Sequence, residues 1–101
     1  MIATIAPPIA PTCICANGTQ MRAALDAATT PQASIQRVFP DMTATLSRSC
    51  DHWMLTLLSD DGPIPQATAD LWAAAVGAPS VEWWRTRQGR RVTCDWTEAG
   101  R

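Results

Sequence analysis

One stretch of this sequence, Val81–Thr97 (VEWWRTRQGRRVTCDWT), limits the fold more than any other. It holds three of the five tryptophans and four of the eight basic residues, all of them arginines. Tryptophan, valine and threonine favour strands on both sides of Gln88-Gly89, where the glycine suits a turn. The stretch therefore predicts a β-hairpin that gathers its arginines at an exposed tip.

The register of this hairpin decides which tryptophan enters the core. With an even-numbered loop, Trp83 lies opposite Cys94, whereas Trp84 points to the other face. The core side then carries Val81, Trp83, Val92, Cys94 and Trp96. Glu82 falls opposite Asp95, which is an unfavourable like-charge pair, and a three-residue loop would relieve it by shifting the register.

The same region also permits a helix-turn-helix interpretation. Pro65–Val76 would be its first helix, Gly77 the turn glycine and Ser80–Gln88 the recognition helix. The segment GAPSVEWWRTRQG is similar to the turn and recognition helix of phage-repressor-type regulators, and this resemblance implies DNA binding. Pro79 inside the turn and the large Trp83 depart from that pattern and favour the hairpin.

The N-terminal third of the chain gives weaker signals. Residues 1–16 are predicted to form an extended N-terminal arm or an edge strand, with its strand at Met1–Ala6. Asn17-Gly18 indicates a turn. Apolar spacing predicts a helix over Gln20–Ala28, and Thr30-Pro31 predicts the start of a second short helix that ends before Pro40.

The middle of the chain predicts a hairpin followed by a helix. Met42–Leu58 alternates apolar and polar residues around a turn at Ser49–Asp51, which places Trp53, Leu55 and Leu57 on one side. The alternative is a helix capped by Ser49. Pro65–Val76 predicts an amphipathic helix that ends at Gly77.

These elements define the expected fold class. A chain of 101 residues has the length of a single domain, here spanning residues 1–101. We expect an α+β fold with short N-terminal helices, a central hairpin, one amphipathic helix and a C-terminal β-hairpin. The alternative is a mostly α fold with a helix-turn-helix at residues 65–89.

The four cysteines, Cys13, Cys15, Cys50 and Cys94, are expected to be free and reduced. The N-terminal twenty residues lack the charged region of a secretory leader, and no apolar run is long enough for a membrane span. We therefore expect a cytoplasmic protein with no membrane partner. A single C-x-C is not a zinc-binding pattern, so no metal and no cofactor are predicted. Cys50 and His52 keep a small cysteine-dependent enzyme as an alternative, but no catalytic residue is assigned.

The predicted partner-binding residues are Trp84, Arg85, Arg87, Arg90 and Arg91. Tryptophan and arginine are common hot spots of protein interfaces. We expect a non-enzymatic binding protein whose partner is a host protein or complex with an acidic surface. Nucleic acid is the alternative partner, and a homodimer is also consistent with the sequence. The absence of lysine and tyrosine is typical of a GC-rich bacterial genome. A small chain of this kind suggests a phage or mobile-element accessory protein that inhibits its host target.

Overall fold

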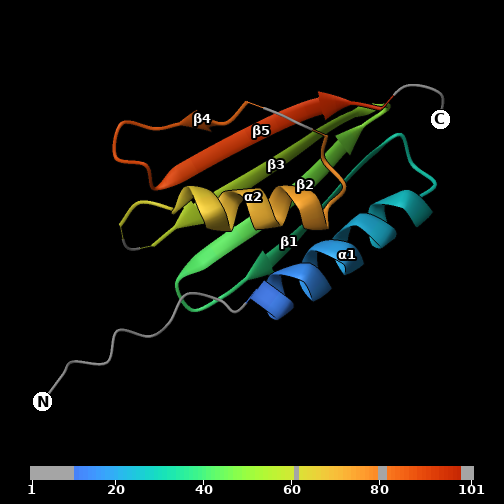
Figure 1. The fold of residues 1–101 in the computed structure, drawn as a ribbon. Coiled ribbons are helices and arrows are strands. Elements are labelled where there is room, and N and C mark those ends of the chain that lie inside the picture. The colour runs from blue at the N-terminus through green and yellow to red at the C-terminus, as the bar shows by residue number, and fades with distance from the viewer. Residues whose placement is uncertain (1–10, 61, 80–81, 99–101) are drawn as a thin grey trace, which may run out of the picture.

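The computed structural model describes residues 11–60, 62–79 and 82–98. Within them the chain forms a two-layer α+β structure of helices packed on an antiparallel sheet (Figure 1), which confirms the predicted fold class. The elements in chain order are α1 (Pro11–Ala27), β1 (Gln32–Val38), β2 (Met42–Ser49), β3 (His52–Ser59), α2 (Gln66–Ala75), β4 (Trp84–Arg85) and β5 (Arg91–Thr97).

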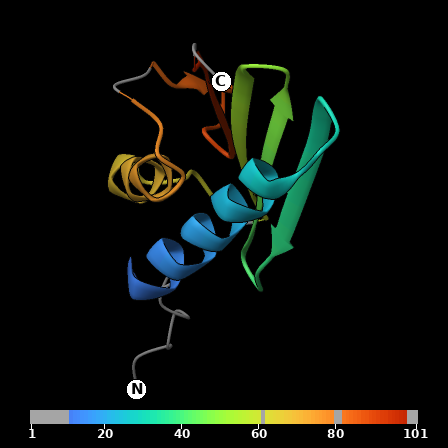
Figure 2. The ribbon, with the colours of Figure 1, turned by 90° about the vertical axis from the view of Figure 1, so that its right-hand side faces the viewer.

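The sheet has the strand order β1-β2-β3-β5-β4, and every neighbouring pair is antiparallel. The first three strands form a meander, and α2 then carries the chain back so that β5 lies between β3 and β4. Figure 2 shows α1 and α2 on the same side of the sheet, where the two helices also contact each other. The sheet therefore has one face covered by helices and one face without them.

The core lies between the helices and the covered face of the sheet. Trp53, Leu55 and Leu57 point into it from β3, as the alternation predicted, and all three are fully buried. Val92, Cys94 and Trp96 enter from β5, and Trp72 of α2 is also fully buried. The apolar positions of the sheet thus repeat every second residue, which is the period of a strand with one buried face.

The central hairpin is confirmed. β2 and β3 pair in a register that places Leu46 opposite Leu55 and Arg48 opposite Trp53. The two strands are joined through Cys50, whose φ of 56° lies in the left-handed region. An L residue is unfavourable there, so packing of the strands, not the turn residue itself, holds this connection.

The C-terminal hairpin and its even-numbered register are also confirmed. Trp84 pairs with Thr93 and Arg85 with Val92, which is the alignment that puts Trp83 opposite Cys94. β4 begins only at Trp84, so ladder pairing stops short of Glu82 and the unfavourable contact with Asp95 does not form. Val81 lies outside the described residues.

The helix-turn-helix alternative at residues 65–89 is wrong. The first of its two helices exists as α2, which begins after Pro65 and ends before Gly77. Gly77 itself has a φ of 77°. The proposed recognition helix does not form. Trp84 and Arg85 are in a strand, and the described residues between 82 and 90 contain no helix. Cross-strand pairing of these β-preferring residues overrides the helix-compatible capping pattern.

The N-terminal predictions need correction. Residues 11–16 were expected in an extended arm and Asn17-Gly18 in a turn, but both segments are inside α1. Pro11 opens the helix, where its missing N–H is no loss. The Asn17 side chain donates a hydrogen bond of 2.9 Å to the Cys13 carbonyl one turn earlier, so it remains within the helix. Residues 1–10, including the predicted strand at Met1–Ala6, lie outside the described residues.

The short helix predicted after Pro31 is also wrong, because this segment is β1. Its residues alternate between half-buried and exposed, which is the period of a strand, and Val38 at its end is 73% exposed. Pro31 and Pro40 lie just outside the strand, where neither interrupts the ladder with β2. Pairing along the whole length of β2 outweighs the local helix-start signal.

Gly18 is needed where α1 crosses α2. A Cβ built at Gly18 would overlap the Cβ of Ala75, so the two helices touch at this point. Changing Gly18→Ala in a helix normally stabilises it by ~0.5–1 kcal/mol. Here we expect overpacking to lower the free energy of unfolding by about 1–3 kcal/mol, measured by urea denaturation.

The matched control is a change at an exposed position of the same helix, Ala16→Ser. It should alter the free energy of unfolding by less than about 0.5 kcal/mol, as surface substitutions usually do. A Gly18→Ala protein as stable as the parent would contradict the close approach of the two helices.

Candidate functional site

The candidate site is the sheet face that neither described helix covers, called here the open face. It consists of the even-numbered residues of β1, β3 and β4 and the odd-numbered residues of β2 and β5. Figure 2 shows both helices on the opposite side of the sheet. Half of the sheet's side chains are therefore presented outward on rigid strands.

The open face concentrates exposed apolar side chains. Val38, Met54, Leu58 and Trp84 are the exposed large hydrophobic residues of the described chain, and all four stand on this face. Trp84 is 59% exposed. A partial signal for this surface is present in the sequence, because the alternation in residues 42–58 puts Met54 on the side opposite to Trp53.

A row of threonines crosses the middle of the open face. Thr45, Thr56 and Thr93 are consecutive cross-strand neighbours, and Trp84 stands next to Thr93 at the end of the row. The hydroxyls of Thr56 and Thr93 are 3.3 Å apart, within hydrogen-bonding distance. Between the four apolar side chains, the face thus offers hydroxyls that can donate or accept hydrogen bonds.

The structure brings two of the five predicted binding residues together on the open face. Trp84 lies on β4, and Arg91 lies on β5 opposite Leu58. The Arg91 side chain is exposed and has no hydrogen bond to any other described residue. A tryptophan and a solvent-exposed guanidinium therefore share a surface with the apolar side chains of β3.

The other three arginines are directed elsewhere. Arg85 points to the covered side and donates hydrogen bonds of 2.8 Å to the Ile64 carbonyl and to Gln66. Arg90 donates a hydrogen bond of 3.1 Å to the Asp60 carbonyl. Arg87 is exposed in the turn. Arg85 and Arg90 thus hold the loop before α2, and the hairpin tip is not one arginine cluster.

His52 lies at one end of the open face, beside Asp95. Its Nε2 is 3.3 Å from an Asp95 carboxylate oxygen, and both side chains are partly exposed. Cys50 lies in the neighbouring turn, and no hydrogen bond joins it to His52 among the described residues. The imidazole therefore lies beside a carboxylate of β5.

The four cysteines are free and differ in exposure. Cys15 and Cys50 are exposed, Cys13 is half-buried and Cys94 is fully buried. Burial, assisted by the nearby charge of Asp95, raises the pKa of the Cys94 thiol to about 12. Over the described residues, no three histidine, cysteine or acidic side chains are placed to hold a metal ion.

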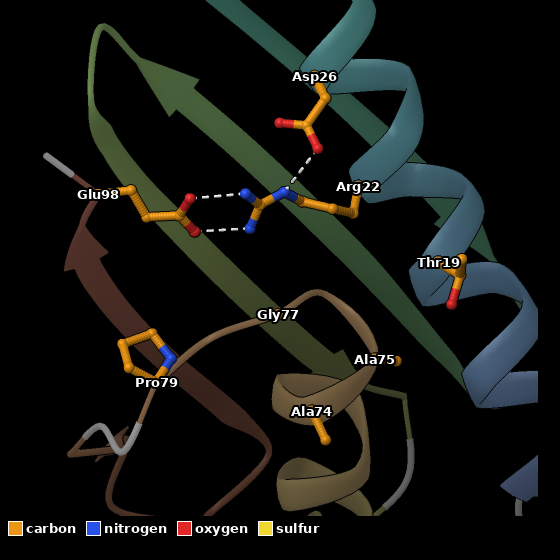
Figure 3. Close-up of a pocket in the computed structure, with 8 residues that line it drawn as sticks. All are labelled: Thr19, Arg22, Asp26, Ala74, Ala75, Gly77, Pro79 and Glu98. Atoms are coloured by element: carbon orange, nitrogen blue, oxygen red, sulfur yellow. Dashed lines mark hydrogen bonds and ion pairs between the residues drawn. The ribbon is translucent and has the colours of Figure 1, made fainter. Parts of the chain in front are cut away.

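Arg22 of α1 forms the main polar contact of the covered side. Its guanidinium makes two hydrogen bonds of 2.6 Å to the carboxylate of Glu98 (Figure 3). This carboxylate also accepts a hydrogen bond of 2.9 Å from the Trp96 indole. It also donates a 3.0 Å bond to the Val76 carbonyl, where α2 ends. The hydrogen bonds to Glu98, above all, raise the pKa of Arg22.

The same guanidinium lies over the ring of Trp53, with 4.1 Å between Cζ and the ring centroid. Trp53 in turn stacks on Trp96, at 6.1 Å between centroids and 9° between planes. No sequence signal indicated this role, because Arg22 lies off the apolar stripe of its helix.

A hollow of about 530 Å³ opens beside this pair, between α1, the end of α2 and Glu98 (Figure 3). Its charged groups are Arg22, Asp26 and Glu98. Arg22 binds both carboxylates, with 3.0 Å from its Nε to Asp26. These ion pairs hold the helices to the sheet, so we assign the hollow a structural role and place the candidate site on the open face.

A scan of protein-family models, a search of curated proteins and a search of solved structures each found no match to this chain. Neither described helix is long and apolar enough to cross a membrane. We therefore infer the function from the chemistry of the open face.

Removing the Arg22 charge should destabilise the fold. In Arg22→Met, the aliphatic stem is kept, but Glu98 and the Val76 carbonyl lose a partly buried partner. We expect the free energy of unfolding to fall by about 2–3 kcal/mol in chemical denaturation.

Arg87→Met is the matched control, because Arg87 is exposed and its loss should change the free energy by less than about 0.5 kcal/mol. The double variant Arg22→Met/Glu98→Gln should be less destabilised than the sum of its single changes, because the two groups interact directly. If the effects of the two single changes on the free energy of unfolding simply added, the Arg22–Glu98 pair would contribute nothing to stability.

The thiols should differ sharply in reactivity, because only thiolates react readily. In native protein at mildly alkaline pH, we expect a thiol reagent to modify Cys15 and Cys50 quickly and to leave Cys94 intact until denaturant is added. Peptide mass spectrometry would locate the label. Rapid labelling of Cys94 in the folded protein would contradict its burial.

The raised pKa of Cys94 also makes the free energy of unfolding depend on pH, and it lowers this free energy at alkaline pH. Below the pKa of an unfolded thiol, ~8.5, Cys94 is protonated in both states. Its contribution to stability is lost as the pH rises toward about 12, because only the unfolded chain gives up the proton there.

Proposed function

We propose that this protein is a non-enzymatic binding protein that docks on another protein through its open face. One observation carries the proposal: within the described residues, all the exposed large apolar side chains stand on that single face. Exposed apolar residues that gather on one surface are typical of a contact site, whereas scattered ones carry no such meaning.

The composition of the face supports a protein partner. Trp84, Met54 and Arg91 belong to the residue types that are enriched in protein interfaces. The threonine row supplies hydroxyls between the apolar side chains, so a partner can be held by apolar contact and by hydrogen bonds. Strands also hold these groups in place, which limits the entropy lost on binding.

The charge of the face supports an acidic partner. The carboxylate of Asp95 has His52 beside it, whereas Arg91 stands next to Leu58 without a described hydrogen-bonding partner. We infer that the partner presents an apolar patch with a carboxylate placed against Arg91. Inhibition of a bacterial host protein by covering its surface is the use that we propose for this contact, on the grounds of chain size and composition alone.

The test is comparative affinity capture from a bacterial lysate, followed by quantitative mass spectrometry. Trp84→Ala/Arg91→Ala removes the exposed ring and the guanidinium from the open face. We expect any specific partner of the parent protein to be recovered at least about tenfold less by this variant, because such residues dominate interface energy.

The matched control is Arg87→Ala/Gln88→Ala, two exposed residues of the adjacent turn that do not belong to the open face. It should recover the partner as the parent does, and circular dichroism should be the same for all three proteins. Equal recovery by the open-face variant would refute the proposal. Saturable binding of a single-stranded oligonucleotide at low salt, lost in Trp84→Ala, would instead assign the face to nucleic acid.

A further inference from the structure

β1 is an edge strand, and within the described residues a single charge, Arg37, is the only one of the usual protecting features that it carries. Among the described residues it pairs with β2 only, and Figure 2 shows it at the margin of the sheet, with α1 on the sheet face and not beyond the edge. It has no proline, bulge or lysine within Gln32–Val38. A regular edge of this length is a template for another strand. The opposite edge, β4, is only two residues long.

The hydrogen bonds at the ends of β1 show which of its backbone groups point outward. The Phe39 N–H bonds to the Met42 carbonyl, and the Pro31 carbonyl accepts from the Cys50 N–H. In an antiparallel ladder these bonded pairs recur at every second residue, so the odd-numbered residues of β1 bond to β2. The even-numbered residues, Gln32, Ser34, Gln36 and Val38, therefore direct their N–H and C=O groups away from the sheet.

We infer that β1 pairs with β1 of a second copy of this chain, antiparallel, with Ile35 on the two-fold axis. In this register Ser34 lies opposite the partner's Gln36, and Gln32 lies opposite the partner's Val38. Every outward N–H of the strand then gains a partner, as do the carbonyls of Ser34 and Val38. The Gln32 carbonyl already accepts a hydrogen bond of 2.9 Å from the Thr30 hydroxyl, and the Gln36 carbonyl accepts one of 3.4 Å from Arg37. Each of these carbonyls has a second lone pair that can accept from the partner strand. Registers centred on Ser34 or Gln36 would leave one end of the strand unpaired.

The side chains of β1 match this register. The strand has one charge, Arg37, which falls opposite the partner's Ala33, so no like-charge pair forms. Ile35 is half-buried against the core and would meet the partner's Ile35 on the covered side. Val38, the most exposed of the large apolar side chains, would lie beside the partner's Gln32 stem.

A second copy fits this edge better than an unrelated strand because the strand complements itself. In a two-fold contact each copy contributes the same strand, so the β1 edges of both copies are paired and neither is left for a third chain. The pairing would join two sheets and set their open faces side by side. This inference does not depend on the proposed function of the open face.

The first test is the oligomeric state of the full chain, by sedimentation velocity from micromolar to millimolar concentration. We expect a reversible dimer. Ser34→Pro removes an outward N–H that β2 does not use, and proline is tolerated at such edge positions. It should raise the dimer dissociation constant at least about tenfold, whereas Trp84→Ala on the open face should leave it unchanged.

A cross-linking test fixes the register and does not depend on the proline variant. In a Cys13→Ser/Cys15→Ser/Cys50→Ser background, Ile35→Cys would face its own copy at about 4.5 Å between Cα atoms, within disulfide range. Ser34→Cys or Gln36→Cys alone would face a different residue, and its own copy would lie diagonally at about 7–8 Å. Oxidation should therefore give covalent dimers with Ile35→Cys only.

Three results would overturn the inference. The first is a parent protein that stays monomeric at millimolar concentration. The second is a dimer that is lost in Trp84→Ala but kept in Ser34→Pro, which would place the contact on the open face. The third is cross-linking at Ser34→Cys or Gln36→Cys instead of Ile35→Cys, which would exclude this register.

Discussion

The contact of Arg22 with Trp53 and Glu98 is the interaction on which the arrangement of the layers depends. It joins α1, the end of α2, the middle of the sheet and the residue that follows β5. Only an arginine can do this, because its planar group stacks on an aromatic ring and still donates in its own plane to a carboxylate and a carbonyl. With both helices held on one side, the other side of the sheet remains uncovered.

Local pattern was sufficient where the strands are joined by short turns. The alternation through β2 and β3 and the turn glycine at Gly89 predicted two hairpins, with Trp53 on the same side as Leu55 and Leu57. The pattern failed where a distant contact decides the local structure. Gly18 is helical because α1 approaches Ala75, and Gln32–Val38 is extended because β2 lies beside it. The residues next to Gly18 do not indicate its contact with Ala75, and those next to β1 do not indicate its pairing with β2.

The same distinction applies to the candidate site. Trp84 and the arginines were predicted from composition, but the strand alternation that separates Arg85 from Arg91 depends on the register with β5. The contribution of β3 was harder to foresee. Leu58 and Met54 join Trp84 on one face only because β5 inserts between β3 and β4, a pairing that brings together residues more than thirty positions apart in the chain.

The position of β5 also determines when the protein can fold during its synthesis. Of the described strands it is the last to be made, yet it lies inside the sheet, and Glu98 comes after it. While the ribosome still holds this segment, β3 has an unpaired side and the stacked partner of Trp53 is missing. The nascent chain can form the meander β1–β3 early, but the core is complete only after β5 has been inserted between β3 and β4, so the sheet is closed from within by a strand that is made later than both β3 and β4.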